Sequence, residues 1–176
     1  MKNFDFILRL AEVIPSFSQL HAYCDKAEIF QKAFPEDSAT NARKALEWLV
    51  QNHLAMAKVT LEPHETLIQM LKRPERDAFV NEDWELIQDM RTVKKIGNYA
   101  AHTGAQQVKA NDAFICLRAL FYVATGFLYR WQAIRKMLAF DATLIPQDFT
   151  QIHASDNSEP TVSPDLTDHV SSEAIN

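Results

Sequence analysis

Apolar residues recur at intervals of three and four along much of the chain, which is the spacing of one face of an α-helix. Between residues 16 and 33 the repeat is formed by Leu20, Tyr23, Cys24, Ala27 and Phe30. Between residues 38 and 57 it is formed by Ala42, Ala45, Leu46, Leu49, Val50 and Leu54. Each stretch is therefore predicted to be a helix that buries one side.

Proline and capping residues indicate where the helices begin and end. Pro35 closes the second helix, because the residue before a proline is disfavoured in helical geometry. Asp37 or Ser38 is expected to cap the third helix, and Asn111 with Asp112 the last one. Helices are predicted over residues 3–13, 16–33, 38–57, 64–72, 81–104 and 112–138.

The longest apolar stretch, residues 113–128, is predicted to be the buried central helix of a bundle. It contains Arg118 and is shorter than the roughly 18 apolar residues that a membrane span requires. Helices that are apolar on all sides also occur at the centre of bundles. We therefore expect the chain to have no membrane partner.

The composition favours the same fold. Only three of the 176 residues are glycine, whereas 47% are hydrophobic, and such scarcity of glycine argues against a turn-rich β-sheet protein. The length fits one domain with a proper core. The sequence thus predicts an all-α, compact bundle of about five or six helices.

The net charge of −5 is unevenly distributed along the chain. All 18 basic residues and 16 of the 23 acidic residues precede residue 141, so that region carries a net charge of about +2. Residues 141–176 contain the other seven acidic residues and are rich in Ser, Thr and Pro towards the end. We expect a helical domain over 1–140, followed over 141–176 by a disordered acidic tail or linker.

Neither metal nor cofactor chemistry is indicated by the sequence. Cys24 and Cys116 lie far apart in apolar surroundings, and no histidine joins them at metal-ligand spacing. We interpret both as reduced core residues. Charged residues interrupt the N-terminal apolar run, so it does not resemble a signal peptide, and we expect a cytoplasmic protein.

Two of the three glycines lie in the stretch KKIGNYAAHTG, residues 94–104. At about 100° per residue, one side of this predicted helix is a polar stripe. The stripe consists of Arg91, Lys95, Asn98 and His102. The opposite side carries small residues, namely Gly97, Ala100 and Ala101.

Glycine within a helix costs about 1 kcal/mol relative to alanine, so Gly97 indicates close packing of a second helix. We expect that neighbour to be the long helix, which has small residues at Ala119, Ala124 and Gly126. Gly104 is expected to end the helix in left-handed geometry. Two interpretations of the polar stripe remain open, a solvated charged face with a capping histidine or a site with chemistry.

Residues 94–104 resemble an R-K-h-G-N-x-A-A-H-x-G signature, in which h is apolar, of a small helical domain. Residues 41–50, NARKALEWLV, look like the A-R-x-A-L-E-x-h-h helix of the same family. This domain is found at the N-terminus of type I restriction R subunits and of DEAD/DEAH-type helicases. The resemblance covers about residues 1–140.

The family is similar to the HEPN superfamily, whose members are all-α bundles that often dimerise. Many HEPN proteins are metal-independent endoribonucleases of phage-defence or toxin–antitoxin systems, with an Arg followed after four to six residues by a His. The matching positions here are Lys95 and His102. Lysine keeps the positive charge but lacks the planar fork with which arginine grips a phosphate.

The resemblance therefore implies a non-catalytic HEPN-like module for dimerisation or docking, with nucleic-acid contact, in a restriction, helicase or phage-defence system. The expected partners are a second copy of the chain, a helicase or restriction subunit or an antitoxin, and RNA or DNA. Nucleic-acid contact is expected at Arg91, Lys94, Lys95, Lys72, Arg73 and Arg76.

The alternative is a metal-independent endoribonuclease. His102 would move the proton of the ribose 2′-hydroxyl, Lys95 and Arg91 would hold the phosphate, and Asn98 would orient it. A third hypothesis is a protein-interaction role for the acidic tail, either as a mimic of nucleic acid or as an occupant of the basic stripe.

Overall fold

The computed structural model describes residues 2–72, 83–101 and 107–147. All regular secondary structure in these ranges is helical, as predicted. The elements are α1 (Asp5–Ala11), α2 (Phe17–Phe30), α3 (Pro35–Met56), α4 (Leu67–Met70), α6 (Trp84–Ala101), α7 (Ala110–Arg130) and the 3₁₀ helix η1 (Ala142–Leu144). Of the tail over 141–176 that was predicted to be disordered, residues 148–176 lie outside the described residues.

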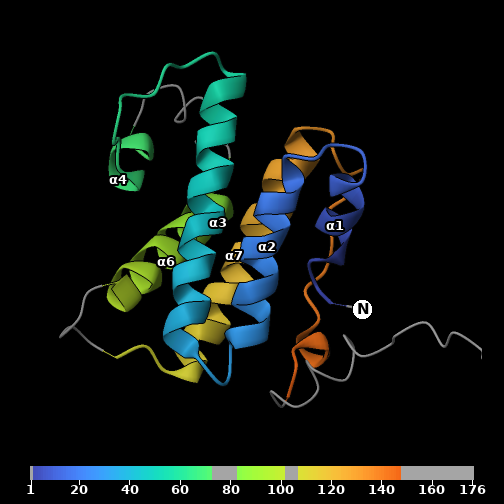
Figure 1. The fold of residues 1–176 in the computed structure, drawn as a ribbon, viewed down its shortest axis with the longest axis vertical. Helices are drawn as coiled ribbons and strands as arrows, with labels where there is room; N and C mark the ends of the chain where they lie inside the picture. Colours follow the sequence, from blue (N-terminus) through green and yellow to red (C-terminus); the bar gives the residue numbers. More distant parts are fainter. Residues whose placement is uncertain (1, 73–82, 102–106, 148–176) are drawn as a thin grey trace, which may run out of the picture.

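Helix α3 is the centre of a compact bundle (Figure 1). It packs against α2 on one flank and α6 on the other, and α7 contacts both α3 and α6. Helix α1 covers α2 at the edge of the bundle. The predicted apolar stripe of α3 is buried along its whole length, from Ala42 to Leu54.

Helix α7 supplies much of the core, as its apolar sequence predicted. Phe121 and Phe127 are almost completely buried, and burying one such side chain contributes about 1.5–3 kcal/mol. By length and composition alone α7 could cross a membrane, but 67% of its most apolar window is buried inside the bundle. In this structure α7 is thus a core helix of the bundle.

Several helix boundaries differ from the prediction. Helix α3 begins at Pro35, with Phe34 at the capping position and no side-chain cap, because proline is well suited to the first helical position. Ser38 instead donates its hydroxyl to the Ala27 carbonyl of α2, at 2.6 Å. Helix α7 ends at Arg130 rather than at 138, and Gln132 follows with a positive φ of 58°.

The start of α7 also differs from the prediction. The helix begins at Ala110, so Asp112 lies inside its first turn. Its carboxylate accepts a hydrogen bond from the Lys109 backbone N–H at 3.0 Å. The predicted capping residue therefore acts from within the helix, and Asn111 is exposed beside it.

The chain stays against the bundle for several residues beyond the predicted boundary at 140. Ile145 is buried, and the Asn3 side chain forms two hydrogen bonds with the backbone of Asp141. Figure 1 shows this C-terminal stretch, which includes η1, returning past α1. The first residues of the acidic region are thus part of the folded body.

Gly97 is buried where α6 meets α3, and not where it meets α7 as predicted. A Cβ on Gly97 would lie 2.6 Å from Arg43 Cβ and 3.0 Å from the Ala39 carbonyl oxygen, both on α3. Gly126 of α7 serves a different contact, because a Cβ on it would face Leu86 of α6. Gly97 therefore sets how closely α6 approaches α3.

We predict that Gly97→Ala lowers the free energy of unfolding by about 1–2 kcal/mol in urea denaturation. The added methyl group overpacks the contact between α6 and α3, which costs about 1–3 kcal/mol. The higher helix propensity of alanine offsets at most about 1 kcal/mol of this cost. Gly126→Ala is the matched control, because its Cβ would meet only the flexible end of Leu86, at 3.2 Å. Equal stability of the two variants would contradict close packing at Gly97.

Candidate functional site

Helix α6 runs without interruption from Trp84 to Ala101 and presents the predicted polar stripe along one side. Arg91 and Lys95 are exposed on it, and Asn98 is half-buried. His102, the fourth residue of the stripe, lies outside the described residues, as does Gly104. The structure thus places three of the four predicted catalytic residues on one helix face.

The packing at Gly97 also brings together the two segments on which the family resemblance depends. Arg43 belongs to residues 41–50 and Gly97 to residues 94–104, and the Arg43 stem covers the glycine. The buried Nε of Arg43 has no hydrogen-bond partner among the described residues. The two segments therefore form one contact in three dimensions, which their order in the sequence does not reveal.

The first turn of α6 is fixed by Asp83. One carboxylate oxygen accepts a hydrogen bond from the Leu86 N–H at 3.0 Å, which caps the helix. The other oxygen pairs with the Arg130 guanidinium at 3.0 Å, so the start of α6 is tied to the end of α7. This pair and Gly97 hold opposite halves of α6 on the bundle.

Arg91 lies over an exposed aromatic ring. Its guanidinium carbon is 5.8 Å from the centre of the Trp84 ring, two helical turns earlier. Trp84 is 66% exposed, which is unusual for so large an apolar side chain. The cation–π contact orients Arg91 along the helix surface towards this exposed ring.

A cleft of about 310 Å³ lies between α6 and the beginning of α7. Lys95 and Tyr99 line it from α6, and Val108 and Asp112 line it from the other side. Val108 is buried, so the cleft has an apolar floor and a polar rim. It is suited to a group that combines an anion for Lys95 with a flat apolar surface for Tyr99.

A second cleft, of about 470 Å³, lies at the other end of α6 and is acidic. Asp83, Trp84, Glu85 and Asp89 line it together with Arg118 of α7. Burial raises the pKa of Asp89 to about 6; Arg118 opposes this shift, and the neighbouring carboxylates add to it. Acidic side chains therefore line the cleft at the start of α6, whereas Lys94 and Lys95 lie in the second half of the helix.

The other predicted nucleic-acid contacts are only partly gathered at this site. Lys94 is half-buried on α6. Lys72 is exposed just after α4, which packs against α3. Arg73 and Arg76 lie outside the described residues. The structure thus unites Arg91, Lys94 and Lys95 on one helix and places Lys72 on a different element.

The cysteines behave as predicted. Both are free and buried. Burial raises the pKa of Cys116 to about 12 and that of Cys24 well above its ordinary value, so neither thiol is poised to react. Among the described residues no group of three or more His, Cys, Asp or Glu side chains could hold a metal ion.

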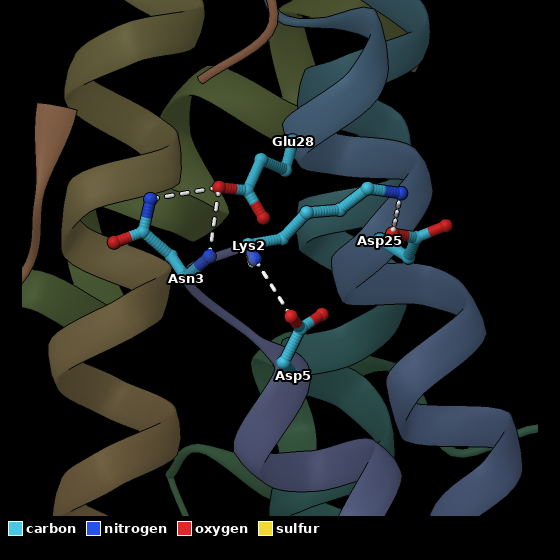
Figure 2. Close-up of polar contacts among 5 residues, drawn as sticks. All are labelled: Lys2, Asn3, Asp5, Asp25 and Glu28. Atoms are coloured by element: carbon cyan, nitrogen blue, oxygen red, sulfur yellow. Dashed lines mark hydrogen bonds and ion pairs between the residues drawn. The ribbon is translucent and has the colours of Figure 1, made fainter. Parts of the chain in front are cut away.

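The sequence pattern did not predict a buried polar cluster near the N-terminus. Asn3 and Glu28 are both buried and hydrogen-bonded to each other (Figure 2). The available signal was the position of Glu28, which follows Cys24 by four residues and so lies on the apolar stripe of α2. A carboxylate on such a stripe requires a buried partner.

Comparisons with protein-family models, with curated proteins and with solved structures found no match to this chain. The resemblance to a HEPN-like domain therefore stays a prediction that depends on residues 41–50 and 94–104. A function is therefore inferred from the contacts, exposure and charge of the described residues in and around these two segments.

We predict that Asp89→Asn stabilises the protein above pH 6 and has little effect near pH 4. Folding raises the pKa of Asp89 from 3.8 to about 6. Its carboxyl group therefore costs no stability below pH 3.8, where it is protonated in both the folded and the unfolded state. The cost grows as the pH rises from 3.8 and is complete once the pH has passed 6. Because the side chain is only half-buried, the gain is at most about 1 kcal/mol.

Thermal unfolding of both proteins between pH 4 and pH 8 measures this difference. Glu85→Gln is the control for removal of one negative charge from the same cleft, since Glu85 is exposed. A stability difference between native protein and Asp89→Asn that stays constant over this range would contradict the assignment.

Proposed function

We propose that the chain is a non-catalytic HEPN-like helical module that dimerises or docks through α6 and contacts nucleic acid with the same face, in a restriction, helicase or phage-defence system. The observation that carries the proposal is the exposed face of α6. Trp84 and Tyr99 lie near its two ends, 66% and 37% exposed, with the exposed cations Arg91 and Lys95 between them.

The residue types on this face support docking. Trp, Tyr and Arg are the residues most enriched among those that dominate the binding energy of protein interfaces. The charges on α6 also favour one relative direction of two paired helices. Glu85 and Asp89 lie in the first half of α6, and Lys94 and Lys95 lie in the second half. Two copies that pair their α6 helices antiparallel bring opposite charges together.

The same cations support contact with nucleic acid. Arg91 and Lys95 are exposed one turn apart, and the cleft beside Lys95 contains the aromatic ring of Tyr99, on which a base can stack. A net charge of about +2 over the first 140 residues is small for a dedicated binder. Binding is therefore local and weakens strongly with salt.

The non-catalytic part of the proposal is supported by Lys95, which occupies the position of the arginine in the catalytic signature. A lysine ammonium is a compact point charge and does not hold two phosphate oxygens in one plane. The neighbouring Arg91 is engaged with Trp84. The cations of this face are thus better suited to phosphate contact than to catalysis.

We predict that Trp84→Ala weakens self-association of the chain by about 2 kcal/mol, or about 30-fold in the dissociation constant. Sedimentation equilibrium over a range of concentrations measures the effect. Val13→Ala is the control for loss of an exposed apolar side chain, because Val13 is 80% exposed just after α1, which packs against α2. A native chain that stays monomeric at high concentration would contradict self-association through α6.

We also predict that changing Arg91, Lys94 and Lys95 together to alanine weakens binding of single-stranded RNA and DNA. The slope of log affinity against log salt should fall by about 2–3, since each lost phosphate contact removes close to one unit. Lys26→Ala, which removes an exposed cation of α2, should leave the slope unchanged. Unchanged binding by the triple variant would contradict the proposed contact.

Incubating the same preparations with RNA in the presence of a chelator tests the catalytic alternative. Intact RNA is expected. Metal-independent cleavage that leaves cyclic phosphate ends, and that disappears in His102→Ala, would replace this proposal with the ribonuclease.

A further inference from the structure

Glu28 of α2 is completely buried, and only one of its two carboxylate oxygens has a hydrogen-bond partner among the described residues. Its Oε1 atom accepts two hydrogen bonds from Asn3, one from the backbone N–H at 3.0 Å and one from the side-chain amide at 2.7 Å. Its Oε2 atom has no partner among the described residues. Figure 2 shows both contacts converging on one oxygen. An ionised carboxylate in this position is costly.

Asn3 connects Glu28 to the other end of the chain. Its amide nitrogen also donates to the Asp141 carbonyl at 2.9 Å, and its amide oxygen accepts from the Asp141 N–H at 2.8 Å. One side chain thus joins three segments, namely the N-terminal residues, α2 and the stretch from Asp141 onwards. That stretch opens the acidic region of residues 141–176.

Lys2, the cation that acts on Glu28 among the described residues, is engaged elsewhere. The Lys2 ammonium forms an ion pair with Asp25 at 2.8 Å, and the Lys2 backbone N–H donates to Asp5. Figure 2 shows Lys2 extended towards Asp25 rather than towards Glu28. The titratable groups around Glu28 are Lys2, Asp5, Cys24, Asp25 and Asp141.

Burial is the largest influence on Glu28 and raises its pKa above the ordinary value of 4.5, with a smaller rise from Asp25. The hydrogen bonds of Asn3 and the charge of Lys2 oppose this rise. Hydrogen bonds from Thr143 lower the pKa of Asp141, and burial raises the pKa of Cys24 well above its ordinary value.

We propose that Asn3 and Glu28 form a proton-dependent latch, which holds residues 141–147 on the bundle when Glu28 is protonated and loosens when Glu28 is ionised. In the closed latch a protonated Glu28 keeps Oε1 as the acceptor for Asn3, and Oε2 carries the proton. Opening exposes the carboxylate to water, where it ionises at its ordinary pKa.

The direction of the pH dependence follows from this difference. The closed state has the higher pKa, so the latch has its full strength below pH 4.5 and weakens as the pH rises through the Glu28 midpoint. Each pH unit between 4.5 and that midpoint weakens the closed state about tenfold. Acidic conditions therefore retain residues 141–147 on the bundle, and neutral conditions favour their release.

Nuclear magnetic resonance on the full chain tests the latch directly. The Glu28 carboxyl carbon should titrate above pH 4.5, and the hydrogen-exchange protection of the Asp141 amide should fall about tenfold per pH unit over the same range. A Glu28 midpoint at or below 4.5, or Asp141 protection that does not change while Glu28 titrates, would overturn the proposal.

Two variants separate the latch from general effects of pH. Glu28→Gln keeps the accepting oxygen without the charge, so the protection of the Asp141 amide should become independent of pH. Asn3→Ala should remove that protection at every pH. Glu36→Gln is the control for loss of a carboxylate, since Glu36 is exposed in the first turn of α3 and is not among the groups that shift the Glu28 pKa, and it should retain the native pH dependence. If Glu28→Gln kept that dependence, the latch would be disproved.

Discussion

The close approach of α6 to α3 at Gly97 is the contact on which the candidate site depends. A side chain at this position would meet Arg43 and the Ala39 carbonyl, so only glycine lets the two helices reach this separation. With Gly97 buried against α3, Arg91 and Lys95 lie exposed on another side of α6. The glycine thus explains both the packing of the bundle and the exposure of the cationic face.

The helices and the buried face of α3 could be predicted from the sequence, because both depend on local periodicity. The choice of neighbour for Gly97 could not be predicted. Small residues on α7 are also suited to close helix packing, but Gly126 of α7 lies opposite Leu86 and not opposite Gly97. Spacing along one helix shows that a close contact exists, but not which helix makes it.

The polar stripe was predicted in the same way, and α6 carries Arg91, Lys95 and Asn98 on one side. The acidic cleft at the other end of α6 was not predicted, because it needs Arg118 and Tyr122 from α7. The Asn3–Glu28 contact was equally hidden, since its partners are 25 residues apart in sequence. Features that combine distant segments require the three-dimensional structure.

The most direct test of this account is to measure the contacts of Gly97 in solution. Nuclear Overhauser effects from the Gly97 α-protons report which side chains lie within about 5 Å, the range in which neighbouring helix residues touch. We predict strong effects to Arg43 and Ala39 of α3. Effects to Ala119 of α7 in their place would show that α6 packs with a different face, and the outward cationic stripe would then be incorrect.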